Sequence, residues 1–181
     1  TLPARFLHDG LAEAIKYGCI KDAALFEKIA GYADDAALLA DIDSVVATCC
    51  AIKARIVEQD EFDTGLRMLL NFGHTLGHAV EQHFGYSCFT HGEGVAIGMY
   101  QLTKRTEELG MTAKGSAERI KSVLEKYNLP LTAGVEKAQL LDTMARDKKK
   151  NGNSITLIIL QQIGEGVLQK VDWQQVPRYL G

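Results

Sequence analysis

The sequence lacks the features that mark a membrane protein, a nucleic-acid-binding protein or a disulfide-stabilised secreted domain. Its longest apolar run, near residues 155–160, is far shorter than the ~20 residues a bilayer-spanning helix needs, and no signal peptide is visible. The net charge of −3 offers no basic excess for nucleic acid or anionic lipid. These absences predict a cytoplasmic protein with neither a nucleic-acid nor a membrane partner.

The cysteines show no pattern that belongs to a metal or redox motif. Cys19, Cys49, Cys50 and Cys88 include no C-x-x-C pair, and Cys49 and Cys50 are adjacent, which an ordinary disulfide avoids. We expect small, buried side chains in a reducing cytosol. The sequence also has neither repeats nor a low-complexity linker. With 181 residues, 46% of them hydrophobic and 24% charged, it fits one globular domain.

Apolar residues recur at helical spacing through most of the chain. Predicted helices cover residues 10–19, 23–30, a stretch that begins at Asp43, and residues 64–83, 92–109, 116–126 and 137–146. Asp9 and Asp22 are the predicted N-caps of the first two helices. Asn128-Leu129-Pro130 is a clear stop.

The sequence changes character after Asn151-Gly152-Asn153. Ser154–Leu160 and Val167–Val171 are typical of strands, and Gly164-Glu165-Gly166 between them is typical of a turn. The predicted fold is therefore mainly α, a multi-helix domain with a small β-hairpin near residues 154–171.

The predicted helix over residues 64–83 is polar on one side. At about 100° per residue, its polar residues fall within a stripe about 60° wide; they are Arg67, Asn71, His74 and His78. The opposite side is apolar, with Leu69, Phe72, Leu76, Ala79 and Val80. A solvated face is usually rich in Glu and Lys, whereas these polar residues coordinate and hydrogen-bond. The stripe therefore favours a functional site.

Two glycines on the same helix support that interpretation. Gly73 and Gly77 each cost about 1 kcal/mol relative to Ala in a helix interior. Close approach of another backbone or of a ligand is the usual reason for such a residue.

Histidines four residues apart can reach one small site, so His74 and His78 are candidate metal ligands. Catalytic metals need a third protein ligand and an open position. His91 and the carboxylates are candidates for that third ligand. His83 lies about 160° around the helix from Arg67 and is therefore predicted to be a structural residue on the apolar side. His8 has no partner in the sequence and stays unassigned.

Several charged residues have an ordinary interpretation when taken alone. Glu13 and Lys16 match an exposed i,i+3 ion pair. Lys53 lies at the edge of an apolar stripe, where a lysine can extend its head to water. The basic run at residues 146–150 ends a helix, where cations favour the dipole.

In combination, four segments resemble the 3-dehydroquinate synthase family of sugar-phosphate cyclases. They are Gly10–Gly18 (GLAEAIKYG), Leu69–Ala79 (LLNFGHTLGHA), His91–Met99 (HGEGVAIGM) and Arg146–Lys149 (RDKK). The resemblance covers nearly the whole chain, but only the helical C-terminal domain of the family. It implies a single metal- and substrate-binding domain over residues 1–181, with the N-terminal NAD-binding domain outside this chain. The abrupt start at Thr1-Leu2-Pro3 agrees with that expectation. Gly94 departs from the family pattern, where Ala is frequent, and is not expected to affect the chemistry.

The resemblance also implies a role for each site residue. It makes Glu13, His74 and His91 the ligands of zinc or cobalt, and His78 a residue that contacts the substrate and transfers protons. Lys16 would lie close to the reacting hydroxyls. The implied contacts to the substrate's carboxylate and nearby oxygens are Lys53, Arg67 and Asn71, with Lys148 as a contact to the phosphate.

The reaction implied by the resemblance converts 3-deoxy-D-arabino-heptulosonate 7-phosphate to 3-dehydroquinate and phosphate, in the shikimate pathway of aromatic amino acid biosynthesis. NAD is reduced and reoxidised within the cycle. The enzyme would be a phosphorus–oxygen lyase that acts as a homodimer at full length, and the 181-residue chain alone would be inactive.

Three alternatives remain at this point. A related cyclase would use the same site residues. A metal-dependent alcohol or glycerol dehydrogenase shares the two-domain plan, but a small neutral alcohol does not need the cluster of Lys53, Arg67 and Asn71. A non-enzymatic helical module with structural zinc would usually be rich in cysteine at its metal site.

Overall fold

A computed structural model describes residues 3–60, 65–151 and 153–180, and the side chains of residues 146–151 are not described. Its α-helices are α1 (Ala4–Lys21), α2 (Ala23–Gly31), α3 (Asp35–Ala40), α4 (Ile42–Gln59), α5 (His74–His83), α6 (His91–Glu108), α7 (Ser116–Lys126) and α8 (Lys137–Asn151). Two 3₁₀-helices, η1 (Leu66–Asn71) and η2 (Val176–Tyr179), and two strands, β1 (Ser154–Gln162) and β2 (Glu165–Asp172), complete it. The predicted class, mainly α with a small hairpin, is confirmed.

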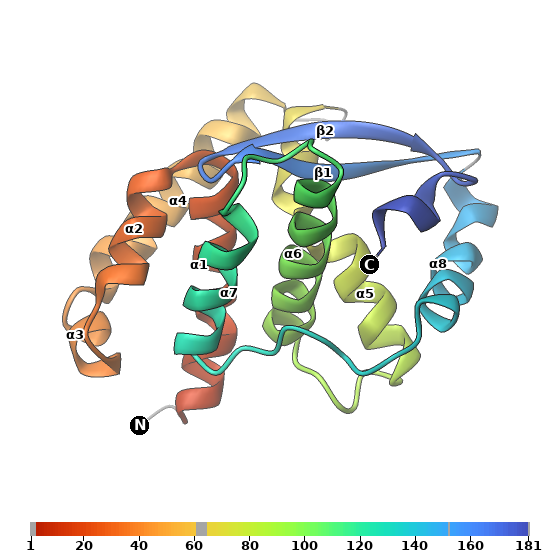
Figure 1. Cartoon of the computed structure of the whole chain (residues 1–181). Coiled ribbons are helices and arrows are strands. Elements are labelled where there is room, and N and C mark those ends of the chain that lie inside the picture. Colours follow the sequence, from red (N-terminus) through yellow and green to blue (C-terminus); the bar gives the residue numbers. More distant parts are fainter. Residues whose placement is uncertain (1–2, 61–64, 152, 181) are drawn as a thin grey trace.

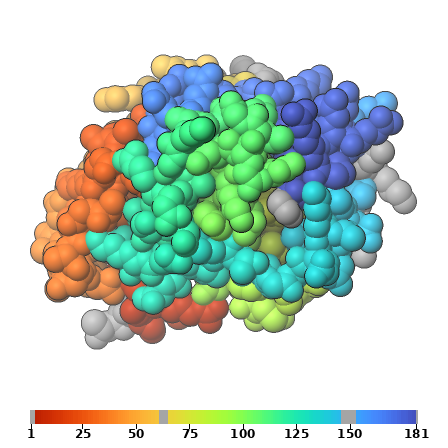
Figure 2. All heavy atoms as spheres, viewed as in Figure 1, coloured from red at the N-terminus to blue at the C-terminus, as the bar shows by residue number. Residues whose placement is uncertain are grey.

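Helix α6 lies at the centre of the fold and packs against α1, α5 and α7 (Figure 1). Helices α2, α3 and α4 lie beyond α1 on one side, and α8 lies beyond α5 on the other. The β1–β2 hairpin crosses one end of this helical layer and contacts both α1 and α6. In the space-filling view, α7 and α6 lie against each other beneath the hairpin (Figure 2). One continuous apolar core results.

The predicted long helix over residues 64–83 is wrong in one respect, because it is broken. η1 ends at Asn71, and α5 begins at His74 after Gly73 adopts a left-handed φ of +80°. At this break the chain crosses α6 so closely that a Cβ on Gly98 would lie 1.9 Å from the carbonyl oxygen of Gly73. The regular 100° spacing therefore does not run from Arg67 through to His78. All five residues of the predicted apolar side are nevertheless buried.

Asp9 was predicted to cap the first helix, and this is also wrong. Helix α1 starts earlier, at Ala4, so Asp9 lies inside it. Its carboxylate instead accepts a hydrogen bond of 2.6 Å from the backbone N–H of Gly92, in the first turn of α6. Asp22 does cap its own helix, α2, by accepting from the Leu25 N–H. The two helices α1 and α6 are thus joined by a cap that comes from a distant segment.

This distant cap carries a prediction. Asp9→Ala should lower the free energy of unfolding by about 1 kcal/mol, since it leaves the Gly92 N–H unsatisfied at a helix N-terminus. Urea unfolding followed by circular dichroism measures the change. Asp34→Ala, which removes the side-chain cap of the short helix α3, is the control and should cost less. An Asp9→Ala protein as stable as the parent would contradict the assignment.

The hairpin follows the prediction, with a tighter turn. Its antiparallel register pairs Ser154 with Asp172 and Gln162 with Glu165, so the turn residues are Ile163 and Gly164 and not Gly164–Gly166. Gly164 has a φ of +93°, and a Cβ there would lie 2.9 Å from Ala23. Glycine is therefore required at this turn both by its backbone conformation and by the contact with α2.

Two predictions about single side chains need correction. Of the four cysteines, all free, only Cys19 is buried, while Cys50 and Cys88 are exposed. His83 is exposed and not on the apolar side, because α5 ends there and its ring lies edge-on to Phe84. His8, which was unassigned, is buried and lies 2.9 Å from the Asp35 carboxylate. Among the described residues, no helix has the length and apolar character needed to cross a membrane.

Candidate metal centre

Three helices bring their polar residues to one point. Helix α1 contributes Glu13 and Lys16, which lie one turn apart on one face. Helix α5 contributes His74 as its first residue and His78 one turn later. Helix α6 contributes His91 as its first residue. Because α6 packs against both α1 and α5, residues separated by up to 78 positions in sequence meet.

Glu13, His74 and His91 form the centre of this cluster. The Oε1 atom of Glu13 lies 3.6 Å from Nε2 of His74 and 3.7 Å from Nε2 of His91. Ligand atoms bound tetrahedrally to zinc are about 3.4 Å apart, given metal–ligand bonds of about 2.0–2.1 Å. The ligand atoms of all three residues lie within 4.8 Å of one another. Their arrangement is therefore of the right size for one metal ion.

The hydrogen bond made by His74 fixes which of its nitrogens can bind a metal. Its Nδ1 lies 3.1 Å from the carbonyl oxygen of Phe72, which can only accept, so Nδ1 carries the proton. The Nε2 lone pair then faces Glu13. The pKa of His74 is lowered to about 4, mainly because the ring is buried and secondly because the positive charge of Lys16 lies nearby. His74 is thus neutral near pH 7, as a metal ligand must be.

Lys16 is buried within the cluster, with 2% of its surface exposed. Its ammonium donates a 2.6 Å hydrogen bond to Oε2 of Glu13. Burial lowers the pKa of Lys16, and the nearby Glu13 carboxylate partly opposes that shift. The predicted exposed ion pair is therefore wrong: the i,i+3 pair exists, but its lysine lies inside the protein.

One buried atom tests directly whether a metal fits. Oε1 of Glu13 is buried and accepts no hydrogen bond from the described residues, although Oε2 of the same carboxylate is paired with Lys16. An unsatisfied buried carboxylate oxygen costs several kcal/mol unless a cation or donor compensates it. Two imidazole nitrogens lie beside it, at the distances given above. The residues present therefore fit a divalent metal.

His78 lies beside the cluster but not within the central triad. Its ring centroid is 5.4 Å from that of His74 and 5.9 Å from that of His91. The side chain is exposed. One turn along α5 from His74, it adjoins an open cleft of about 450 Å³, which is also lined by Asn71 and His74. His78 is thus placed to contact a molecule in that cleft.

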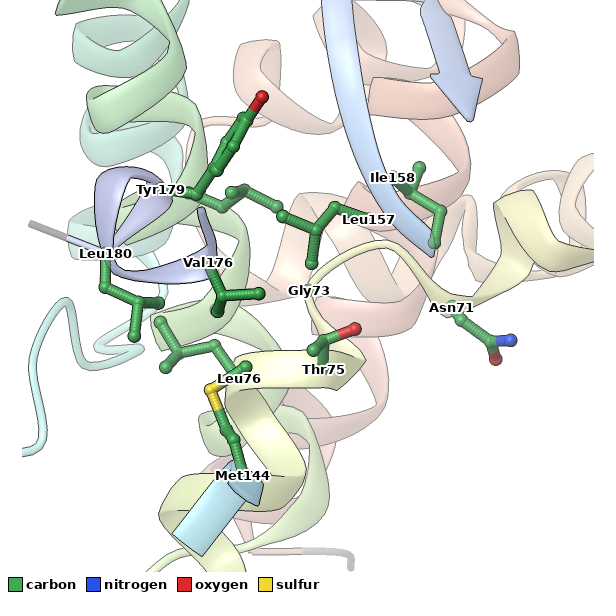
Figure 3. Close-up of a pocket in the computed structure, with 12 residues that line it drawn as sticks. Asn71, Gly73, Thr75, Leu76, Met144, Leu157, Ile158, Val176, Tyr179 and Leu180 are labelled. Carbon is green, nitrogen blue, oxygen red and sulfur yellow. The ribbon is translucent and has the colours of Figure 1, made fainter. Parts of the chain in front are cut away.

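Residues from outside the recognisable segments form the other wall of the cleft. Met144 of α8, Ser154 and Thr156 of β1, and Trp173 line it. These residues lie far from the histidines in sequence, so no sequence pattern indicated that they line the cleft. A neighbouring apolar cavity of about 10 Å³ is also lined by Gly73. Figure 3 shows Leu76, Met144, Leu157 and Val176 gathered on one side of Gly73, while Asn71 points away from them. The start of α5 thus lies against apolar side chains.

Four residues were predicted to bind the carboxylate and phosphate of the substrate, and of these Asn71 lines the cleft. Asn71, the last residue of η1, is exposed and lines the cleft. Lys53 of α4 is exposed, and it is near enough to Lys16 for its charge to act on the pKa of Lys16. Arg67 is half-buried in η1, where its backbone N–H donates to Asp60. Lys148 lies in α8, but its side chain is outside the part that the structure describes.

One residue that the sequence reasoning passed over completes the cluster. Glu81 is buried, and its Oε1 lies 3.3 Å from Nδ1 of His91. It follows His74 by seven residues and His78 by three, so ordinary helical spacing puts it on the same face. That spacing was the available signal.

Comparison with known proteins identifies the family to which the chain belongs. A family model described as 3-dehydroquinate synthase C-terminal matches residues 10–150. The chain belongs to the 3-dehydroquinate synthase family. It is 46% identical to the 3-dehydroquinate synthase of Clostridium acetobutylicum over 181 residues, which cover 99% of this chain and 51% of that protein. The Enterococcus faecalis enzyme is 36% identical with the same coverage. The chain thus spans about half the length of these curated family members.

Solved structures share the fold. A 2-epi-5-epi-valiolone synthase from Streptomyces hygroscopicus, solved with NAD+ and Zn2+, matches 99% of this chain and 51% of its own at a TM-score of 0.82 and 24% identity. A 2-deoxy-scyllo-inosose synthase solved with carbaglucose-6-phosphate, NAD+ and Co2+ matches 97% of this chain and 52% of its own, at 0.79 and 19%. About half of each of these two proteins therefore has the same fold as this chain.

Proposed function

We propose that this chain is the metal- and substrate-binding half of a 3-dehydroquinate synthase. The observation that carries the proposal is the convergence of Glu13, His74 and His91, with the Glu13 Oε1 left unsatisfied, beside an open cleft that His74 lines. Identity of 46% to a 3-dehydroquinate synthase supports this activity over others of the fold. The cycle would run from the heptulosonate 7-phosphate to 3-dehydroquinate and phosphate.

Glu13, His74 and His91 would hold zinc or cobalt. When bound, the metal would act as a Lewis acid toward substrate oxygens and stabilise negative charge that develops on them. The three ligands come from rigid helices, and His74 is held in the right tautomer by the Phe72 carbonyl. The protein's contribution is thus a preformed set of three ligands.

Lys16 and His78 would carry out the chain's own part in proton transfer and charge balance. Lys16 is the buried cation beside Glu13, so it offsets the ligand's negative charge and places a donor near the reacting hydroxyls. His78 is an exposed imidazole at the cleft edge, placed to exchange a proton with a molecule bound there. Lys16 would therefore act from the metal side of the substrate, and His78 from the cleft side.

Cationic and amide side chains would bind the acidic substrate. Asn71 lines the cleft, and Lys53 and Arg67 lie on neighbouring elements, α4 and η1, which contact each other. We assign these three to the carboxylate and nearby oxygens, and Lys148 to the phosphate. A substrate with a carboxylate and a phosphate needs several such contacts to be held in one pose.

NAD would be bound mainly by the half of the enzyme outside these residues. When bound, NAD would supply a transient oxidation of the substrate with no net redox change, and the ketone present at that stage makes the adjacent C–H acidic enough for phosphate to leave by elimination. We therefore predict that the 181-residue chain alone, supplied with NAD and Zn2+, does not release phosphate from the heptulosonate 7-phosphate. A colorimetric phosphate assay measures this. Turnover by the isolated chain would contradict the division of labour.

The activity itself is tested on the full-length protein that contains these residues. Purified enzyme with NAD and Co2+ should convert 3-deoxy-D-arabino-heptulosonate 7-phosphate to 3-dehydroquinate with one phosphate per product, identified by mass spectrometry. Sedoheptulose 7-phosphate and glucose 6-phosphate, which lack the carboxylate, are the matched controls. Preference for either control would favour another cyclase of the same fold, such as the valiolone and inosose synthases to which the chain is structurally similar.

A further inference from the structure

Glu81 is a carboxylate buried beside the metal centre with no role in the proposed cycle. It lies on α5, one turn beyond His78, and 7% of its surface is exposed. A buried carboxylate is costly unless a hydrogen bond or a cation compensates it. Among the described residues, its side chain contacts Nδ1 of His91, which lies 3.3 Å from Oε1.

The contact with Glu81 is made by the ring nitrogen of His91 that does not face the proposed metal site. The other nitrogen of the same ring, Nε2, faces Oε1 of Glu13 at 3.7 Å. If Nδ1 donates its proton to Glu81, the Nε2 lone pair is left free for the metal and the ring plane is fixed. His91 is otherwise exposed, with 47% of its side chain accessible, so this contact restrains a ring that has few packing neighbours.

Packing between α5 and α6 holds Glu81 in place. Gly77 and Gly94 let the two helices approach so closely that a Cβ on Gly77 would lie 2.8 Å from the backbone of Gly94. A Cβ on Gly94 would lie 3.3 Å from Cγ of Glu81. The Glu81 side chain therefore passes through the gap left by a glycine on its way to His91. Gly94 thus lies directly against the Glu81 side chain.

The position of His91 at a helix N-terminus gives the carboxylate a second effect. His91 is the first residue of α6, where the aligned peptide dipoles place about half a positive charge. That charge disfavours a divalent cation bound to the residue. Glu93, the acidic residue in the same turn, already accepts two hydrogen bonds from Arg5 and closes the capping box. Glu81 is thus the carboxylate that faces Nδ1 of His91, while Glu13 faces Nε2 of the same ring.

We infer that Glu81 is a positioning residue for the metal: its carboxylate accepts the Nδ1–H of His91, orients the Nε2 lone pair toward Glu13 and His74, and raises the affinity of the centre. The inference rests on the metal site of the proposed function and adds a residue to it. Loss of such an outer partner typically weakens metal binding about 10–100-fold.

The test uses Zn2+ and Co2+ with the 181-residue chain, and its readouts do not depend on catalysis. Glu81→Gln keeps an acceptor but removes the charge, and it should raise the Zn2+ dissociation constant about 10-fold. Glu81→Met keeps the side-chain volume but removes the hydrogen-bond acceptor, and it should raise the Zn2+ dissociation constant by up to about 100-fold. It should also alter the visible spectrum of the Co2+ form. Competition against a chromogenic chelator gives the constants. Glu125→Gln, an exposed carboxylate on α7, is the matched control and should change neither.

Each other outcome has a definite meaning. If both Glu81 variants bind Zn2+ as tightly as the parent with an unchanged Co2+ spectrum, the positioning role is wrong while the metal centre stands. If the parent chain binds two ions and the variants one, Glu81 is a ligand in a second triad with His78 and His91, whose ligand atoms also lie within 4.8 Å of one another, and the inference is overturned. If the parent chain binds no metal, both the assignment of the metal centre and the positioning role of Glu81 are wrong.

Discussion

Replacing His74 with alanine is expected to abolish metal binding, whereas replacing His78 with alanine should leave it intact. His74 supplies one of three ligands, and its loss should weaken Zn2+ binding by more than the roughly 100-fold that loss of an outer partner costs. His78 belongs to the same helix and lies one turn away, but its ring is exposed and outside the triad formed with Glu13 and His91. The sequence spacing does not distinguish the two histidines as metal ligands, whereas the fold places only His74 in the triad with Glu13 and His91.

Metal analysis after gel filtration separates the two variants. His74→Ala should elute without zinc, and His78→Ala should carry as much zinc as the parent. His83→Ala, an exposed histidine at the end of the same helix, is the control for nonspecific loss and should also keep its zinc. If both His74→Ala and His78→Ala lose the metal equally, the chelating pair suggested by i,i+4 spacing is correct and the triad with Glu13 is wrong.

Activity gives the second half of the distinction. In the full-length enzyme, His78→Ala should reduce kcat by about 10²–10⁴-fold, the usual contribution of a general acid or base, with metal content unchanged. A His78→Ala enzyme with normal kcat would remove His78 from proton transfer but would leave the ligand assignment untouched.

The fold was largely predictable because its elements obey local rules. The spacing of Val45, Ile52 and Ile56 predicts an amphipathic helix, and α4 buries those three side chains. The helix predicted over residues 116–126 has the same bounds as α7. The hairpin follows from β-branched residues on either side of a glycine turn. In each case, the information lies within a few neighbouring residues.

The site was less predictable, because it depends on contacts between distant segments. Helical spacing grouped His74 with His78, and nothing local could show that Glu13, 61 positions earlier, supplies the oxygen between His74 and His91. Family resemblance supplied that grouping. Asp9 shows the same limit: its sequence neighbours suggest a cap for its own helix, while the fold uses it on α6. Glu81, by contrast, was within reach of the helical spacing of His74 and His78.

Gly98→Ala should have the largest effect on stability of any change considered, a loss of at least about 3 kcal/mol of the free energy of unfolding. A Cβ at Gly98 would lie 1.9 Å from the backbone oxygen of Gly73 and 2.8 Å from its carbonyl carbon. Side chains can rotate away from an added methyl group, but a backbone carbonyl cannot. Gly73 itself cannot yield easily, because it holds a φ of +80° and is followed directly by α5.

Gly10→Ala is the matched control for this change. Gly10 is also a helical glycine, on α1, but a Cβ there meets nothing within 4 Å. Alanine at that position should raise stability by about 0.5–1 kcal/mol through helix propensity alone. Urea unfolding of both variants beside the parent measures the contrast. Equal stability of Gly98→Ala and the parent would mean that α5 and α6 do not touch at this point.

The same substitution connects the packing to the metal. Gly73 immediately precedes His74, so an alanine at Gly98 that pushes Gly73 away must also move the first residue of α5. In the fraction of Gly98→Ala that remains folded, Zn2+ should therefore bind more weakly than to the parent, while Gly10→Ala should bind it normally. Folded Gly98→Ala with parental zinc affinity would show that His74 is positioned by its bond to Phe72 and not by the glycine contact. The helix crossing at Gly73 and Gly98 would then serve stability alone.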